Sequence, residues 1–371
     1  MSRRKENVSP EKWNDWNWQV ENQIRTVEDL EEFLNLTDEQ REEIKEVTKT
    51  YAWETTPYYA SLMDPDDPNC PIRKQALPSK EELYDPVGVQ DPLKESEHQP
   101  VKGIVRVYPD RVAFTISNKC AMLCRHCFRK EYVNMPHTFV SHEDVMNAVQ
   151  WIKETPEIRD VLLTGGDPFL NDTEWLEEII APIREIKHVE VIRIGSRTPC
   201  TMPQRITPEL VNMLKKYHPL WVNVHFNHPK EVTEDAKRAC GMLADAGIPL
   251  GNQCVLMKGI NDDAKTQMEL VHKLVEMRVR PYYLLQCQIL HGTAHFRTPI
   301  ETGIDIIYNL QGWTSGFCIP TFLLDTPYGK CPMFPQRIVN RDTYSVSLKN
   351  FKGQIWTEPN PMPGYDYPKQ K

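Results

Sequence analysis

The sequence predicts an α/β fold whose core is a barrel or partial barrel of parallel strands, because three features of the chain agree. From about Arg111 onward, short runs rich in β-forming residues alternate with amphipathic helical patterns, giving six β-then-α units in succession. The unusual stretches with chemistry-bearing residues follow the ends of the predicted strands, as they do in barrels of this kind. No G-x-G-x-x-G motif follows the first strand, which disfavours the alternative of a doubly wound sheet.

Residues 1–100 are predicted to form an extension outside the barrel. Apolar residues recur at helical spacing in "TVEDLEEFLNLTDEQREEIKEVTKTYAW", where Thr37 is placed to cap the second helix and Glu39 lies in its first turn. The stretch from 64 to 92 is rich in proline and acidic residues. We therefore expect a helical region followed by an extended arm that packs along a neighbouring surface.

Residues 101–335 are predicted to form the partial barrel, and residues 336–371 a short C-terminal segment. The first helix after a barrel strand should be capped by Ser141 and bury one apolar face made of Val145, Ala148, Val149 and Ile152. The later helices are expected to begin near Asp172, Thr207, Thr233 and Asp263. The six predicted strands cover residues 111–117, 160–165, 189–196, 220–227, 248–256 and 280–287.

Composition and charge argue against several classes of protein. The chain carries 44 Lys and Arg against 52 Asp and Glu, a net charge of −8, with no dominant basic block. Nucleic acid is therefore not expected as a main partner, because phosphate contacts need clustered positive charge. No segment is apolar and long enough to span a bilayer. The ten cysteines form one tight group and scattered singletons, which is typical of a reducing compartment, so we expect a soluble, cytoplasmic protein.

Three cysteines, Cys120, Cys124 and Cys127, follow the first barrel strand at CxxxCxxC spacing. A structural zinc site needs four protein ligands, usually with a second cysteine or histidine pair, and the sequence offers no such pair. His126 lies between two of the cysteines, where its side chain is expected to point away from a shared metal. An iron–sulfur cube held by three thiolates leaves one iron open to a small molecule, so we favour a [4Fe-4S] cluster over a zinc knuckle.

CxxxCxxC after the first strand of a partial (β/α)6 barrel resembles the signature of radical S-adenosylmethionine (SAM) enzymes. The resemblance narrows to the lysine 2,3-aminomutase family in "WNDWNWQV", "ITPELVNMLKKYHP", "HFNHP", "LADAGIPLGNQ", "RPYY", "HFRTPI" and "TSGFCIPTF", and it runs from Trp13 to about Glu358. It implies an isomerase with a [4Fe-4S] cluster, SAM and pyridoxal 5′-phosphate (PLP), which moves the α-amino group of a free amino acid to Cβ. In that family an electron from the cluster cleaves SAM, and the adenosyl radical removes a hydrogen from Cβ.

The same resemblance implies where SAM binds. The open iron would hold the amino and carboxylate groups of SAM, and "TGGDP" matches the turn along which the methionine part lies. Without the resemblance, a GG turn indicates only a tight loop, and the histidine of "HFNHP" a core or turn residue. The implied SAM contacts are Gly165, Gly166, Asp167, Ser196, His225 and Gln253.

The PLP site is implied by two further stretches. Lys330 in "DTPYGK" matches the lysine that attaches the cofactor, although the family loop is longer and richer in glycine than this one. Tyr108 and Arg111 in "RVYPDR" match cofactor contacts, with Arg111 expected at the phosphate. A second family arginine is Val107 here, and the adjacent Arg106 is a candidate to replace it.

Substrate recognition is implied by three residues. Arg129, two residues after the last cysteine, matches the arginine that grips the substrate carboxylate, for which a bidentate guanidinium is suited. Asp325 retains one of two family aspartates that hold a distal ammonium, and Gln288 replaces the other. A lone carboxylate favours L-lysine or another basic amino acid such as ornithine or arginine, and it disfavours glutamate. Gln288 can donate and accept, so a neutral polar substrate stays an alternative.

The remaining expectations concern structural zinc, partner proteins and alternative functions. Full-length relatives carry a zinc-binding tail and a core cysteine, and here the chain stops at Lys371 with Asp263 at the core position, so we expect no structural zinc. The resemblance implies an electron donor such as flavodoxin or ferredoxin, and possible homo-oligomers. The rival functions are a radical SAM enzyme without PLP that modifies a macromolecule, and a non-catalytic zinc-binding module.

Overall fold

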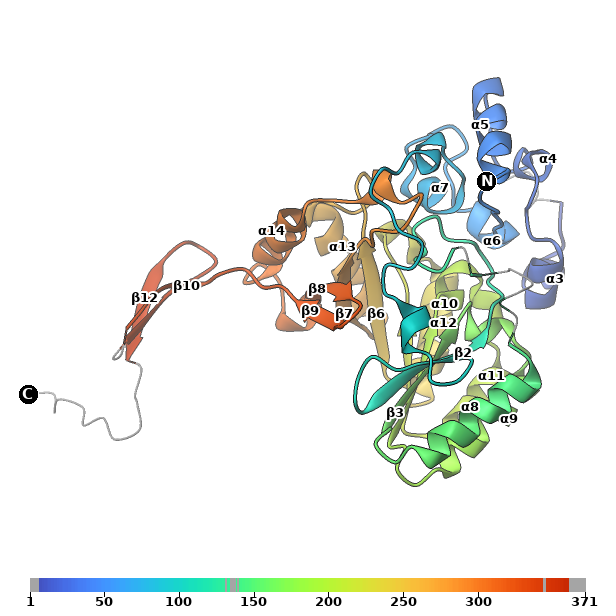
Figure 1. Cartoon of the computed structure of the whole chain (residues 1–371). Coiled ribbons are helices and arrows are strands. Elements are labelled where there is room, and N and C mark those ends of the chain that lie inside the picture. Colours follow the sequence, from blue (N-terminus) through green and yellow to red (C-terminus); the bar gives the residue numbers. More distant parts are fainter. Residues whose placement is uncertain (1–6, 131, 134–137, 139, 343–344, 360–371) are drawn as a thin grey trace, which may run out of the picture.

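The computed structural model describes residues 7–130, 132, 133, 138, 140–342 and 345–359, so the end of the predicted C-terminal segment lies outside the described residues. A nine-stranded sheet forms the body, and its strands are ordered in space as they are along the chain, from β1 to β9 (Figure 1). The seven strands β2 to β8 pair in parallel, and antiparallel strands close both edges. The predicted architecture is therefore confirmed, with one more parallel strand than the sequence indicated.

The strand bounds agree closely with those predicted. The ranges 111–117 and 160–165 are reproduced, and the other four predicted strands start or stop one to three residues away. The hairpin formed by β8 and β9 was not predicted. The strands are β1 Ile104–Val105, β2 Arg111–Ser117, β3 Asp160–Gly165, β4 Val191–Ser196, β5 Leu220–Val224, β6 Leu250–Leu256, β7 Val279–Gln286, β8 Thr321–Thr326 and β9 Gly329–Pro332.

Helices cover the outer face of this sheet, each following a parallel strand. Ser141 caps α8 through a capping box with Asp144, and the four apolar residues predicted for its inner face are all buried. The predicted later starts at Asp172, Thr207, Thr233 and Asp263 are the N-cap residues of their helices. The helices are α8 His142–Glu154, α9 Thr173–Glu185, α11 Pro208–Leu214, α12 Glu234–Asp245, α13 Ala264–Glu276 and α14 Ile300–Leu310.

Alternation along each strand separates the core from the barrel interior. In β3, Val161 and Leu163 are fully buried in the core, while Leu162 and Thr164 point to the opposite side and line a cavity. The interior face of the sheet is therefore available for binding.

The N-terminal extension consists of short helices joined by turns: α2 Pro10–Trp13, α3 Trp16–Glu21, α4 Val27–Leu30, α5 Asp38–Thr48, α6 Pro57–Ala60 and α7 Pro71–Ala76. Thr37 caps α5, as predicted, in a capping box with Gln40. The prediction of an extended arm is partly wrong, because residues 64–92 contain α7 and the 3-10 helix η1 Lys80–Leu83. Pro71 at the first position preorganises α7, and Ser79 caps η1. A second 3-10 helix, η2 Glu95–His98, follows.

The C-terminal segment forms a separate antiparallel sheet that projects from the body (Figure 1). Its strands are β10 Ile338–Arg341, β11 Ser345–Lys349 and β12 Ile355–Pro359. Several of its apolar side chains are exposed, including Ile355 and Trp356. In the part of the chain that the structure describes, no helix is both long and apolar enough to cross a membrane.

Candidate active site

A cavity of about 480 Å³ lies on the interior face of the sheet, where the carboxyl ends of the strands meet the segment after β2. Among its lining residues are seven of the predicted site residues: Tyr108, Arg111, Arg129, Gln253, Gln288, Asp325 and Lys330. They come from positions up to 222 residues apart, so the fold, and not local sequence, brings them together. The lining also includes a stacked pair of tyrosines, Tyr282 and Tyr283, on β7.

The β8–β9 hairpin positions Lys330. Pro327 and Tyr328 form a two-residue turn, and the register of the hairpin pairs Asp325 directly with Lys330. Directly paired residues project from the same face of a sheet, and here Lys330 Nζ donates to Asp325 Oδ2 at 2.5 Å. Lys330 therefore lies on a strand at the edge of the sheet, and its ammonium is paired with a carboxylate. The turn that precedes it is shorter than the loop expected from the family.

Tyr108 and Arg111 stand beside the backbone of this lysine. The amide of Lys330 donates to Tyr108 Oη at 2.7 Å, and the Arg111 guanidinium carbon lies 3.6 Å from the centre of the Tyr108 ring. Arg111 Nη1 also lies 2.9 Å from Asp110 Oδ1. The arrangement places a cation, a hydroxyl and the lysine at one end of the cavity, where the phosphate and ring of a PLP molecule would need them.

Val107 lines the cavity, but Arg106 does not replace the arginine that is absent there. Arg106 does not line the cavity; its Nη2 donates to the Pro109 carbonyl and its guanidinium lies over the Trp151 ring of α8. The structure therefore does not support Arg106 as the substitute, because its guanidinium is engaged outside the cavity. Arg193 of β4 lines the cavity instead, 2.7 Å from Asp160, and sequence reasoning missed it.

Arg129 is buried at the opposite part of the cavity and is already paired. Its Nε and Nη2 donate to the two oxygens of Glu95, at 2.9 and 2.5 Å, and its Nη1 donates to Thr164 Oγ1 and the Gly165 carbonyl. Attraction to Glu95 raises the pKa of Arg129 above its usual range although burial opposes this. Glu95 begins η2, so the arm supplies a carboxylate where a substrate carboxylate is expected, which the sequence did not reveal.

Gln288 and Asp325 lie side by side. The Gln288 amide donates to the main-chain carbonyl of Asp325 at 3.2 Å, and both side chains line the cavity. The carboxylate of Asp325 is paired with Lys330. A cationic side chain of a substrate would meet one carboxylate and one amide here.

Residues 118–130, which we name the cysteine loop, carry Cys120, Cys124 and Cys127. Within the described residues, no three His, Cys, Asp or Glu side chains converge closely enough to hold a single metal ion. A [4Fe-4S] cube makes a different demand, because each thiolate binds a separate iron. Burial raises the pKa of the Cys127 thiol to about 11 and that of Cys120 well above its usual value, and positive charge at a bound centre would stabilise their thiolate forms.

Gly165 and Gly166 hold the cysteine loop against the end of β3. The amide of Gly166 donates to the Ser117 carbonyl at 2.6 Å, and the next amide donates to the Lys119 carbonyl at 2.7 Å. A Cβ on either glycine would collide with these carbonyl oxygens, and Gly165 has a φ of +118°. The glycine pair therefore permits the approach of two backbones beside Cys120.

Asp167 and Ser196 are in contact with each other, and their polar atoms are engaged. The Asp167 carboxylate accepts from Ser196 Oγ at 2.7 Å and from three amides, those of Phe169, Arg197 and Thr198. These bonds join the segments after β3 and β4. Their predicted contact with SAM stays a prediction, and the observed role is to position the two segments.

His225 follows β5 and lies against His126 of the cysteine loop, with ring centres 5.4 Å apart. Burial lowers the pKa of His225 well below its usual value, and its Nε2 has no hydrogen-bond partner. A neutral histidine with an unused ring nitrogen fits a ligand contact at the predicted adenosyl site. Gln253 lines the cavity near it, on β6.

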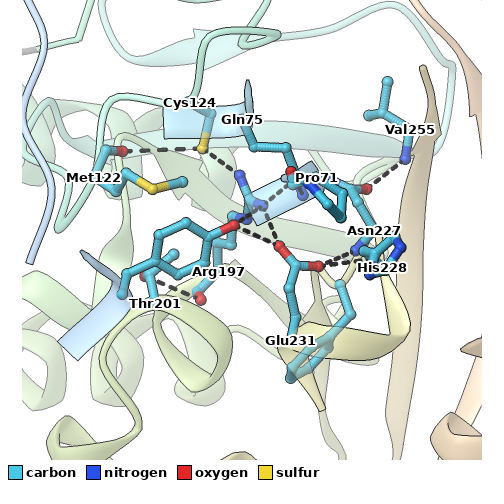
Figure 2. A network of polar contacts seen from close by, with 12 residues as sticks. Pro71, Gln75, Met122, Cys124, Arg197, Thr201, Asn227, His228, Glu231 and Val255 are labelled. Atoms are coloured by element: carbon cyan, nitrogen blue, oxygen red, sulfur yellow. Dashed lines mark hydrogen bonds and ion pairs between the residues drawn. The ribbon is translucent and has the colours of Figure 1, made fainter. Parts of the chain in front are cut away.

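Arg197, which the sequence did not single out, joins the cysteine loop to the rest of the molecule. It follows β4, is buried, and its Nη1 donates to Cys124 Sγ at 2.7 Å (Figure 2). Its Nη2 lies 2.8 Å from Glu231 Oε1 and 2.6 Å from Gln75 Oε1. Only the position of "GSRTP" after a strand, beside Ser196, could have signalled its importance.

Comparisons with known proteins agree with this geometry. A model of the radical SAM superfamily matches residues 114–271, and a lysine-2,3-aminomutase model matches residues 307–369. The L-lysine 2,3-aminomutase of Clostridium subterminale is 51% identical over 358 residues, covering 96% of this chain and 86% of that protein. That of Fusobacterium nucleatum is 50% identical, covering 96% and 84%. The glutamate 2,3-aminomutase of Clostridioides difficile is 43% identical, covering 94% and 83%. The partial barrel is thus of the radical SAM type, and the chain belongs to the lysine 2,3-aminomutase family of radical SAM enzymes.

Proposed function

We propose that this protein is a radical SAM, PLP-dependent amino acid 2,3-aminomutase, an isomerase that moves the α-amino group of a basic amino acid, L-lysine foremost, to Cβ. The observation that carries the proposal is that one cavity, beside the cysteine loop, holds all the groups that the reaction needs. These are an arginine for the substrate carboxylate, a lysine paired with an acid, a cationic end for a phosphate and a carboxylate for a distal cation. Its volume of about 480 Å³ suits a cofactor and an amino acid together.

Each residue has a distinct task in this proposal. Cys120, Cys124 and Cys127 hold the cluster, and the backbone near Gly165 and Gly166, with His225 and Gln253, receives SAM. Lys330 attaches PLP, whose phosphate end is held by Tyr108 and Arg111. When bound, the cluster and SAM supply hydrogen abstraction by a carbon radical, and PLP supplies a ring that delocalises the unpaired electron near the migrating nitrogen.

Arg129 fixes the orientation of the substrate. Its backbone amide donates to Cys127 Sγ at 3.4 Å, so the residue that would hold the substrate carboxylate belongs to the cysteine loop itself. Restricting the substrate at its carboxylate and its distal end keeps the Cβ hydrogen within reach of the abstracting carbon.

The substrate class follows from Asp325 and Gln288. A carboxylate beside a donor–acceptor amide favours the distal cation of lysine, ornithine or arginine, and it repels the side chain of glutamate. Glutamate stays the second candidate, since a relative at 43% identity is a glutamate 2,3-aminomutase.

The test is anaerobic turnover with a panel of free amino acids. Reconstituted and reduced enzyme is incubated with SAM, PLP and each amino acid, and β-amino products are separated by chromatography and identified by mass. We expect β-lysine, or the β-isomer of another basic amino acid. Turnover of glutamate without lysine, ornithine or arginine would contradict the argument from Asp325.

Two spectroscopic controls separate the rival functions. A visible band of lysine-bound PLP that disappears in Lys330→Ala supports an aminomutase, whereas its absence from the wild type favours an enzyme without PLP that modifies a macromolecule. Iron and sulfide in the anaerobically purified protein support the cluster, and zinc in their place favours a zinc-binding module.

Partners and surroundings follow from the same chemistry. The cluster needs a one-electron donor of low potential, of the flavodoxin or ferredoxin type, and the ten free cysteines suit a reducing cytoplasm. Self-association through the C-terminal sheet would cover the exposed Ile355 and Trp356. Light scattering of the full chain tests this, and a monomer at all concentrations would contradict it.

A further inference from the structure

Among the described residues, Arg197 is the one whose charged side chain donates a hydrogen bond to a sulfur of the cysteine loop. Its Nη1 donates to Cys124 Sγ at 2.7 Å, and the side chain is 8% exposed. The donor reaches the sulfur from the end of β4, 73 residues away in the sequence, so the contact is tertiary and not part of the local loop geometry.

The opposite side of the guanidinium is fixed by three groups. Nη2 donates to Glu231 Oε1 at 2.8 Å and to Gln75 Oε1 at 2.6 Å (Figure 2). It also donates to Tyr59 Oη at 3.4 Å. Glu231 is fully buried and also accepts from Tyr59 Oη and the amides of Asn227 and His228. The guanidinium therefore has one orientation, with Nη1 directed at the sulfur.

The N-terminal extension completes this support. Gln75 lies on α7 and Tyr59 on α6, and the Gln75 carbonyl accepts from the Arg125 amide, next to Cys124. The same helix thus touches the cysteine loop through its backbone and the guanidinium through its side chain. Such a support is more than packing requires, because an apolar side chain could fill the space without a buried ion pair.

We propose that Arg197 is a positioning residue that raises the reduction potential of the cluster through its hydrogen bond to the Cys124 sulfur. Hydrogen bonds and positive charge at a cluster sulfur stabilise the reduced state, which holds more negative charge. In the step concerned, the oxidised cluster takes up one electron from an external low-potential one-electron donor, and no covalent bond forms or breaks. Glu231 binds Nη2 whereas the sulfur accepts from Nη1, so the carboxylate orients the guanidinium and offsets only part of its charge at Cys124.

The first test is a redox titration of the cluster in Arg197→Gln and Arg197→Lys, without substrate. At a fixed potential we expect the ratio of reduced to oxidised cluster to fall about tenfold in Arg197→Gln, which equals about 59 mV for one electron. Arg197→Lys keeps the charge but loses the planar fork, so its shift should have the same sign and be smaller. Unchanged potentials in the variants that bind a full cluster would overturn the proposal.

Arg205→Gln is the matched control. Arg205 is also buried, but its guanidinium donates to Phe169 O, Asn171 O and Thr173 Oγ1 and touches no cysteine. A purely structural effect of removing a buried arginine would shift the potential in both variants. We expect the shift only at Arg197.

A measurement on the wild type covers the case in which the Arg197 variants bind no cluster. The protein is labelled with ¹⁵N in its arginine guanidinium groups, and the reduced cluster is examined by pulsed electron paramagnetic resonance. We expect a weak ¹⁵N coupling in the wild type that is retained in Arg129→Lys; its absence would overturn the proposal. These readouts rest on the cluster of the proposed function but need no turnover, so a failure to form β-amino acids does not affect them.

Discussion

Asp325 illustrates how one residue serves two partners. Its carboxylate pairs with Lys330, and in the proposed function this pairing would end when the lysine attaches PLP. We predict that Asp325→Asn lowers kcat/KM for lysine by about 10- to 100-fold, since a charge-assisted hydrogen bond contributes about 1.5–3 kcal/mol. Steady-state kinetics with lysine and a neutral amino acid of similar length measure the effect. An equal loss for both substrates would show that Asp325 does not select charge.

Gln288→Asp is the complementary variant. It restores a second acid beside Asp325, so selectivity for lysine over the neutral substrate should rise in this variant and fall in Asp325→Asn.

Glu95 occupies the edge of Arg129 that a bidentate carboxylate would use. We predict that Glu95→Gln lowers KM for lysine by about three- to tenfold, because the substrate carboxylate no longer competes with a negative charge. Glu97→Gln, in the same turn but paired with Lys94 at the surface, is the control and should leave KM unchanged. An increase in KM for Glu95→Gln would mean that Glu95 mainly orients Arg129.

At the scale of elements, the β8–β9 hairpin depends on Gly329. Its φ is +114°, and a Cβ would lie 3.0 Å from the Tyr108 ring. We predict that Gly329→Ala destabilises the fold by about 1–3 kcal/mol and weakens PLP binding, since Tyr108 and Lys330 must move. Thermal unfolding and titration with PLP measure the two effects.

Gly353→Ala is the control that distinguishes the effect of backbone strain from the effect of a steric contact. Gly353 also has a positive φ, but nothing lies within 4 Å of its added Cβ. It should destabilise without changing PLP binding, and a loss of PLP binding there would argue against a local effect in Gly329→Ala.

The elements that sequence reasoning found are those with a local cause. The face of α8 and its cap at Ser141 lie within one helix, and hydrophobic runs mark the parallel strands. The β8–β9 hairpin was missed because proline and glycine in "DTPYGK" indicate a loop. Its own pairing is local, but β8 joins the sheet by pairing with β7, which no local pattern shows. The same limit applies to the site. The resemblance named Arg129, but Glu95 and Arg197 act through contacts 34 and 73 residues apart, which no local pattern encodes.

For the whole molecule, buried histidines should set the acid limit of stability. Burial lowers the pKa of His228 and His295, so each is neutral in the fold and takes up a proton on unfolding below about pH 6.5. The unfolded state then binds more protons, and stability falls as pH drops, by up to about 1.4 kcal/mol per pH unit and group. We predict that His295→Gln reduces the drop in Tm between pH 7.5 and 5.5. His142→Gln at the exposed start of α8 is the control, and an equal effect of both variants would contradict the prediction.

The ion pairs of the cavity have a joint consequence for what can enter it. The four cations among its described lining residues each have a carboxylate partner: Arg111 with Asp110, Arg129 with Glu95, Arg193 with Asp160 and Lys330 with Asp325. The cations of the cavity are thus already paired, and a charged ligand would bind by exchanging partners with them. A ligand with only negative charge would displace carboxylates from their cations and leave those carboxylates unpaired. A zwitterion with an extra cation would supply a new cationic partner to a carboxylate that it displaces. In the proposed function, a basic amino acid would therefore leave fewer charges of the cavity unpaired than an acidic one.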